Sequence, residues 1–135
     1  MATFRVGELL LGLPVSAVEE VVDVQLVVDV PLAPPEVCGL INLRGRILAA
    51  VDGRASFGLP ARPGGPSPVH VVLAAEGEPA SLVVDEVGDV VLVADSEREA
   101  VPETLAPALR RLVTGAFQQP SALLLVLDPD LVLAL

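Results

Sequence analysis

The chain is a succession of short runs of valine and leucine, and each run stops after a few residues at proline, glycine or aspartate. Branched apolar residues in runs of this length are typical of β-strands, and the residues that end the runs favour turns. No window of about 18 residues is free of charge, proline and glycine, so a membrane-spanning helix is not expected. The pattern therefore predicts a mainly β protein made of many short strands.

The predicted strands lie on either side of a segment rich in proline and glycine, ARPGGPSP at residues 61–68. Such residues form turns and cannot extend a central strand, so this segment is the clearest candidate for a linker. The expected strands cover residues 3–15 (two strands around a turn at Gly7), 16–28, 70–75, 81–93 and 122–127, and residues 104–112 are expected to form a helix.

Two stretches of the chain resemble each other without a gap, AVEEVVDVQLV at 17–27 and VVDEVGDVVLV at 83–93. Valine bias raises the similarity, but acidic positions coincide as well, for example Glu20 with Glu86. The shift is about half the chain, which predicts an internal duplication with two small antiparallel barrels of roughly 60 residues. A barrel of that size is marginal alone and gains stability by packing on its twin.

The charge and the cysteine content narrow the classes of partner and the compartment. With a formal net charge of −10, eight arginines and no lysine, the chain would repel a phosphate backbone, so nucleic acid is not an expected partner. Cys38 is the single cysteine, which rules out an intrachain disulfide and makes a reducing cytoplasm the default. Residues 5–17 partly resemble a signal peptide, but Glu8 and the breaks at Gly12 and Pro14 argue against one.

Few residues could support catalysis. His70 in PVHVVL has no serine or cysteine partner nearby, so a hydrogen-bonded structural histidine is expected. Cys38 is expected to act as a small buried hydrophobic residue, because no histidine or lysine near it in sequence would lower its pKa. Asp128 and Asp130 in LDPDLVLAL could bind a metal, but an aspartate before proline more often caps a short helix. We predict no cofactor and no enzymatic activity, and a small metal-dependent β-barrel enzyme using Asp128, Asp130 and His70 is the alternative.

The segment GLINLRGRILAAVDGR, residues 39–54, places two arginines and a glycine between two apolar runs. Either residues 40–52 form one extended strand, or Arg44 and Gly45 form a tight turn in which the glycine supplies the positive φ. In both alternatives the guanidinium of Arg44 lies on the side away from the core, held by rigid elements. It is then either solvated or paired with a neighbouring acid, or it serves recognition.

These motifs together resemble the CheW family, the adaptors of bacterial chemosensory arrays. GLINLRGRILAAVD is similar to the family signature, and LPVSAVEEVV and LVVDEVGDV are similar to two further segments in the same order. The resemblance implies a mainly β, CheW-like fold of two pseudo-symmetric SH3-like five-stranded β-barrels packed together, with short helices. We expect a single domain over residues 1–135. Its first barrel would cover roughly 15–66, with strand exchange from the N-terminus, its second roughly 67–125, and residues 126–135 would pack back.

The resemblance also implies a non-catalytic, cytoplasmic protein that is recruited to membrane-associated receptor arrays without inserting into the membrane. The expected partners are the regulatory domain of a CheA-type histidine kinase, the cytoplasmic tip of a chemoreceptor, and other CheW-like proteins in array rings. The family's signature arginine falls on Arg44 and its glutamate on Glu20, and the two are expected to form an ion pair at a partner surface. The alternative is a divergent adaptor with an altered partner face, serving an output such as motility control or gene regulation.

Two sets of partner-binding residues follow from the resemblance. The kinase contact is expected in the first half, at Arg44, Gly45, Arg46 and Ile47. The receptor helices are expected in a groove between the barrels, at or near Val18, Val21, Leu40 and Val87. One departure from the family pattern stands out, because Gly53 in VDGR replaces an apolar residue expected to anchor the segment that follows.

Overall fold

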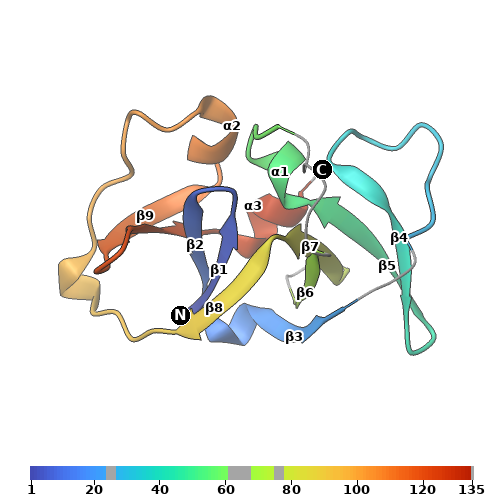
Figure 1. Cartoon of the computed structure of the whole chain (residues 1–135), viewed down its shortest axis with the longest axis horizontal. Helices are drawn as coiled ribbons and strands as arrows, with labels where there is room; N and C mark the ends of the chain where they lie inside the picture. The colour runs from blue at the N-terminus through green and yellow to red at the C-terminus, as the bar shows by residue number, and fades with distance from the viewer. Residues whose placement is uncertain (24–26, 61–67, 75–77, 135) are drawn as a thin grey trace.

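The computed structural model describes residues 1–23, 27–60, 68–74 and 78–134, and it contains two five-stranded sheets with a few short helices (Figure 1). The strands are β1 (Ala2–Val6), β2 (Leu9–Leu13), β3 (Val18–Val22), β4 (Val37–Leu43), β5 (Arg46–Asp52), β6 (Val69–Leu73), β7 (Ala80–Val84), β8 (Glu86–Val90), β9 (Val113–Gln118) and β10 (Leu123–Leu127). The helices are η1 (Val15–Ala17), α1 (Gly53–Ser56), η2 (Asp95–Glu97), α2 (Pro107–Arg110) and α3 (Pro129–Leu133). The predicted fold class, a mainly β protein of two five-stranded units, is confirmed.

The two sheets have the same strand order and the same strand directions. The orders are β3-β6-β7-β5-β4 and β8-β1-β2-β10-β9, and in each the third and fourth strands run parallel while the other neighbours are antiparallel. In each sheet the chain beyond the first strand returns to the last, through backbone bridges between Val28 and Leu40 and between Glu99 and Ala116. Each sheet therefore closes into a barrel, and the equivalence supports the internal duplication.

The division between the barrels differs from the expected boundary near residue 66. Strands β6 and β7 complete the first barrel, whereas the N-terminal hairpin β1–β2 joins the second barrel, beside β8 and β10. The chain passes between the barrels at residues 14–17 and again at Asp85, the single residue between β7 and β8. Most of the segment 61–68 lies outside the described residues, and it connects α1 to β6 of the same barrel. Turn-forming residues mark loops inside a barrel as well as linkers, so composition could not separate the two.

Among the described residues, buried side chains form three apolar clusters. The largest draws on both barrels, with Val6 and Leu125 from the second and Leu82 from the first, and Val132 of α3 packs into it. Each smaller cluster belongs to one barrel, around Ile41 in the first and around Phe117 and Leu124 in the second. All five residues of β7 are buried, because one face of this strand lines its own barrel and the other packs on the second barrel.

The two barrels also use the same helix cap. Asp128 Oδ1 accepts a hydrogen bond from Asp130 N at 2.9 Å at the start of α3, as predicted. Asp52 Oδ1 accepts one from Arg54 N at 3.0 Å at the start of α1. Both caps follow the strand that runs parallel to its neighbour, β10 and β5, so the repeat extends beyond the stretches that are visibly alike in sequence.

The helix expected at residues 104–112 is shorter, since α2 begins at Pro107 and ends at Arg110. Proline suits the first position of a helix, and the chain must become extended again at β9, which leaves room for little more than a turn. None of the described helices is long and apolar enough to cross a membrane.

Candidate functional site

The site is built on the β4–β5 hairpin, whose turn consists of Arg44 and Gly45. Leu43 pairs with Arg46, which leaves a two-residue loop, and φ is 51° at Arg44 and 87° at Gly45. Positive φ at both central residues defines a type I′ turn, the hairpin turn that matches the twist of the flanking strands. Asn42 Oδ1 accepts a hydrogen bond from Gly45 N at 2.9 Å and braces the turn. Of the two alternatives left by the sequence, the structure shows the hairpin.

Arg44 occupies a backbone conformation that suits glycine or asparagine better than arginine. A side chain in the left-handed region costs roughly 1–2 kcal/mol, because its Cβ approaches the following carbonyl oxygen. The side chain of Arg44 is 67% exposed, so burial does not offset this cost. The fold alone gives no reason for an arginine at this position.

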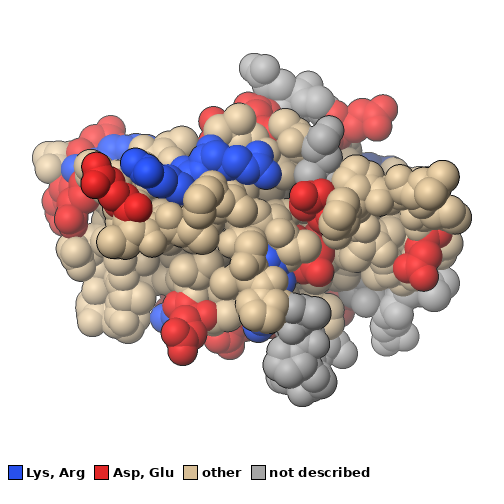
Figure 2. Space-filling view, turned by 90° about the horizontal axis from the view of Figure 1, so that it is seen from above, with Lys and Arg blue, Asp and Glu red and all other residues tan. Residues whose placement is uncertain are grey.

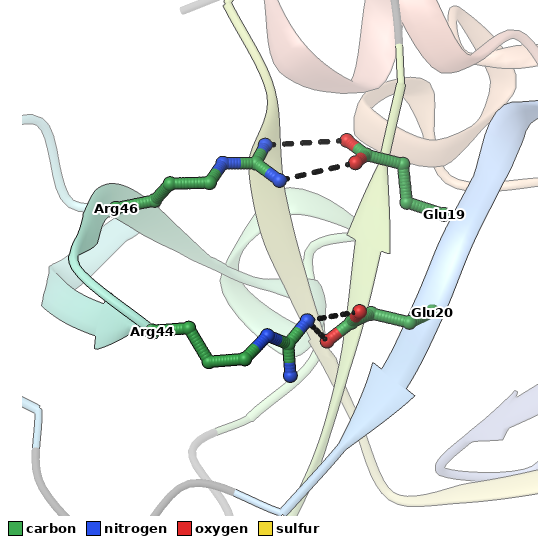
Figure 3. Close-up of polar contacts among 4 residues, drawn as sticks. All are labelled: Glu19, Glu20, Arg44 and Arg46. Carbon is green, nitrogen blue, oxygen red and sulfur yellow. Dashed lines mark hydrogen bonds and ion pairs between the residues drawn. The ribbon is translucent and has the colours of Figure 1, made fainter.

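Two ion pairs join the hairpin to β3 (Figure 3). Arg44 Nη2 donates to Glu20 Oε1 at 2.6 Å and also to Oε2. Arg46 Nη1 and Nη2 donate to Glu19 Oε1 and Oε2 at 3.2 and 3.4 Å. The predicted pair of Glu20 and Arg44 is confirmed, but it uses a single nitrogen, whereas the parallel two-nitrogen arrangement belongs to Arg46 and Glu19, which the sequence analysis did not pair.

The position of these pairs is as informative as their geometry. Strand β3 and the β4–β5 hairpin lie at opposite edges of the sheet, so the pairs span the seam where the first barrel closes. An exposed pair such as Glu20–Arg44 stabilises a protein by about 0–1 kcal/mol. The hydrogen bond from Arg46 to Glu19, followed by the charge of Glu19, raises the pKa of Arg46. The pairs therefore orient two permanent cations at the barrel tip more than they hold the barrel together.

The tip formed by Arg44, Gly45, Arg46 and Ile47 also carries an apolar side chain. Ile47 follows Arg46 on β5, so its side chain points to the other face of the hairpin, and it is 61% exposed. A β-carbon built on Gly45 would meet nothing within 4 Å, so the turn itself is open to solvent. A hairpin tip that exposes one isoleucine and two arginines offers the mixture of anchor and rim that protein interfaces use.

The residues expected to line a groove lie in three different environments. Val21 on β3 and Val87 on β8 are 45% and 44% exposed. The two strands are equivalent, because each stands at the same end of the strand order of its sheet. In Figure 1, β3 runs along the lower side of the view and β8 runs from its centre to the lower left. Val18 is half-buried and packs against the shared core, and Leu40 is half-buried on β4, the far strand of its sheet. The structure thus places Val21 and Val87 on equivalent exposed strands and sets the other two apart from them.

Strand β8 adds an apolar residue that the sequence analysis missed. All five of its residues are exposed, and Val90 is 66% exposed. A strand with no buried face gives no alternation of apolar and polar residues, so the sequence pattern could not distinguish Val90 from a core valine. Two exposed valines, Val87 and Val90, on a strand that also carries Glu86 and Asp89 offer a small apolar surface with charged neighbours, which suits a binding surface.

His70 is the buried structural histidine that was predicted, whereas Cys38 has structural surroundings but is half-buried and not buried as expected. His70 is 1% exposed, its Nδ1 lies 3.1 Å from Ser81 Oγ, and burial lowers its pKa. Cys38 Sγ donates to the carbonyl of Ala50 at 3.2 Å, and its pKa is raised by burial first and by the charge of Asp52 second. The imidazole is therefore neutral and the thiol protonated at pH 7, and neither is activated for nucleophilic chemistry.

His70 and Cys38 line a pocket of about 250 Å³ together with Asp29 and Asp52. Across residues 1–23, 27–60, 68–74 and 78–134, no three histidine, cysteine, aspartate or glutamate side chains are arranged to hold a metal ion.

On the face shown in Figure 2, basic side chains gather in one band and acidic side chains surround it, so this face presents mixed charge.

Comparison with known proteins gives one consistent answer. A family model described as the CheW-like domain matches residues 1–135. The chain is 29% identical over 133 residues to the chemotaxis protein CheW of Bacillus subtilis, covering 98% of this chain and 85% of that protein. It is 29% identical over 132 residues to the chemotaxis protein CheW of Rhizobium meliloti, covering 96% and 84%. Among solved structures, the scaffolding protein TtCheW of Thermoanaerobacter tengcongensis superposes with a TM-score of 0.85 at 27% identity, covering 99% of this chain and 91% of that one.

Proposed function

This chain belongs to the CheW family, and on that premise we propose that it is a non-catalytic adaptor that couples chemoreceptors to a CheA-type histidine kinase. Its relatives are named as chemotaxis and scaffolding proteins, which supports a scaffold in chemotaxis. In this proposal the protein acts in the cytoplasm, at membrane-associated receptor arrays, and its mechanism is the geometry of binding.

The main support for the proposal is the conformation of Arg44. Its backbone is strained, its side chain is exposed, and its ion pair with Glu20 contributes little stability. Strain that the fold does not require is most often found where a side chain serves a function. Glu20 holds one nitrogen of the guanidinium, which restricts the Arg44 side chain and lowers the entropy lost when a partner binds it.

We assign the kinase contact to the tip of the first barrel, Arg44, Gly45, Arg46 and Ile47. The regulatory domain of the kinase is expected to offer a barrel of the same kind, so the contact would be barrel against barrel. Ile47 supplies an apolar anchor and the two arginines supply direction and charge. Such signalling contacts are modest, roughly 1,000 Å² in total, and other CheW-like proteins are expected to use the same kind of contact in array rings.

We assign the receptor contact to the exposed valines of β3 and β8. The receptor tip is a helical hairpin, and an amphipathic helix binds by laying its apolar face on an apolar surface. Val21, Val87 and Val90 supply that surface from both barrels. Val18 would support this face from the core, and Leu40, although on the last strand of the sheet, would adjoin it where the chain after β3 bridges to β4 at Val28.

An adaptor must bind both partners at once, and this requirement is the basis of the test. The purified protein is mixed with the kinase regulatory domain and a receptor-tip hairpin from the same organism, and complexes are resolved by analytical ultracentrifugation. The proposal predicts a complex that contains all three proteins. The kinase domain and the receptor hairpin should not associate with each other when this protein is left out. Binding to one partner only would favour the divergent adaptor with an altered face, and binding to neither would contradict the proposal.

A further inference from the structure

Asp85 is the single residue that separates β7 of the first barrel from β8 of the second. The chain enters Asp85 from one sheet and leaves it in the other, so the backbone angles of this residue help to set the angle between the barrels. The other passage, residues 14–17, is tied to the first barrel by a hydrogen bond from Ala74 N to the carbonyl of Ala17 at 2.8 Å. Two such passages define an axis about which one barrel could turn relative to the other.

The side chain of Asp85 is held from the first barrel by Arg54. Arg54 Nε donates to Oδ1 at 3.2 Å and Nη2 donates to Oδ2 at 2.7 Å, which is a two-nitrogen arrangement. The third guanidinium nitrogen, Nη1, donates to the carbonyl of Pro60 at 3.3 Å. Arg54 stands in α1, where its own backbone N–H is bound by the capping carboxylate of Asp52.

Asp85 is held from the second barrel as well. Its Oδ2 accepts a hydrogen bond from Gly7 N at 2.6 Å, in the turn between β1 and β2. Its backbone N–H donates to the carbonyl of Arg5 at 2.9 Å. A single carboxylate therefore binds a guanidinium of the first barrel and a backbone amide of the second.

This ion pair is far less exposed than the two at the seam of the first barrel. The side chains of Arg54 and Asp85 are 16% and 17% exposed, against 67% for Arg44 and 47% for Arg46. The hydrogen bond to Asp85 raises the pKa of Arg54, so the guanidinium remains charged at every relevant pH. Less exposure means less screening by solvent, and the two-nitrogen geometry makes the contact directional.

The surroundings leave α1 little freedom to move. A β-carbon on Gly53 would lie 2.6 Å from the carbonyl oxygen of Val83, so this position accepts only glycine without a shift of the backbone. The segment after Gly53 is anchored by Phe57, which is 1% exposed and packs in the shared core. The apolar anchor expected at Gly53 is thus supplied four residues later, and Arg54 is fixed in place beside Asp85.

We infer that Arg54 sets the angle between the two barrels by holding Asp85, and that it is a positioning residue for any partner that contacts both barrels. The shared apolar core holds the barrels together, but apolar contact has no direction and permits small rotations. The Arg54–Asp85–Gly7 contacts supply the direction. The consequence for receptor binding rests on the proposed function, whereas the consequence for the barrel angle does not.

The angle can be measured without any partner. On a Cys38→Ser background, cysteines at the exposed positions Ala74 in the first barrel and Gln118 in the second carry spin labels, and the distance between the labels is measured by pulsed electron paramagnetic resonance. Arg98→Met is the matched control, because Arg98 donates to Thr114 within the second barrel. We expect one narrow distribution for the parent and for Arg98→Met, and a broader or displaced distribution for Arg54→Met.

Arg54→Lys provides the second variant. Lysine keeps the charge but cannot bridge both carboxylate oxygens as a planar fork, so its distribution should lie between the other two. A distribution for folded Arg54→Met that superposes on that of the parent would overturn the inference. If circular dichroism shows that Arg54→Met does not fold, a parent-like distribution for Arg54→Lys would overturn it equally.

Partner binding provides the separate readout. Arg54→Met should bind the receptor-tip hairpin at least about 10-fold more weakly while its affinity for the kinase regulatory domain stays within about twofold, because the kinase contact uses one barrel. Equal losses for both partners would contradict the positioning role. A parent protein that does not bind the receptor hairpin would contradict the proposed function, and the label distances would still decide the role of Arg54.

Discussion

Glu19 and Asp85 occupy equivalent places in the internal repeat, and each binds an arginine through two nitrogens. Glu19 binds Arg46 across the seam of the first barrel, and Asp85 binds Arg54 at the junction of the two barrels. The same acidic position thus has two different uses after duplication. One pair orients a side chain at an exposed tip, and the other joins structural units.

Replacing Arg44 by asparagine should separate function from stability. Asparagine tolerates positive φ and forms the favoured Asn-Gly turn, so relief of strain should offset the lost ion pair, and we expect the free energy of unfolding to stay the same or rise by about 1 kcal/mol. Urea denaturation measures the change. A loss of more than about 2 kcal/mol would show that Arg44 is needed for the fold, because surface substitutions normally change stability much less.

Gly53 and Gly45 should respond differently to alanine. At Gly53 the new methyl group would meet the backbone of Val83, so we expect Gly53→Ala to lower the free energy of unfolding by about 2–3 kcal/mol. At Gly45 there is open space, and only the positive φ is unfavourable, so Gly45→Ala should cost about 1 kcal/mol. Equal losses in urea denaturation would argue against the close approach of α1 and β7.

The stability of the protein should depend on pH through His70. Burial lowers the pKa of His70 below its ordinary value of 6.5, so below that pH the unfolded state binds a proton that the folded state does not. The contribution of neutral His70 to the free energy of unfolding should therefore be fully present above pH 6.5. As the pH drops below that value, the free energy of unfolding should fall with a slope of at most about 1.4 kcal/mol per pH unit. The His70→Gln variant should lack this step in thermal melts between pH 5 and 7, and an identical step in both proteins would refute the assignment.

Cys38 should react slowly with thiol reagents. Its pKa is raised by burial and by Asp52, so the thiolate is scarcer at pH 7 than in a free cysteine. Labelling with a coloured disulfide should be slower in the folded protein than in urea by about 10-fold or more. Equal rates would place the thiol in contact with solvent and contradict its hydrogen bond to Ala50.

The sequence predicted features that depend on a few neighbouring residues. The glycine of the hairpin, the cap at Asp128 and the structural roles of His70 and Cys38 each follow from local chemistry. The Glu20–Arg44 pair followed only from the family resemblance, because the two residues stand on separate strands. The pairing of Glu19 with Arg46 was missed because the sequence of a strand does not indicate which other strand will lie beside it when the barrel closes.

The sequence could not predict which strands belong to which barrel, for a related reason. Strand β2 runs parallel to β10, and β7 runs parallel to β5, and such pairings join segments far apart in the chain. The apolar runs of β6 and β7 would be buried equally well in either barrel, so their composition does not choose between them. The junction at Asp85, and with it the role of Arg54, became visible only with the sheet order.

The most direct test of the central claim is an affinity titration of the protein against the CheA-type kinase regulatory domain of the same organism. The parent, Arg44→Asn and Arg98→Met are compared at equal salt, after circular dichroism has shown that all three are folded. The account predicts equal dissociation constants for the parent and Arg98→Met, and one about 10-fold or more higher for Arg44→Asn. A folded Arg44→Asn that binds the kinase domain as tightly as the parent would contradict it.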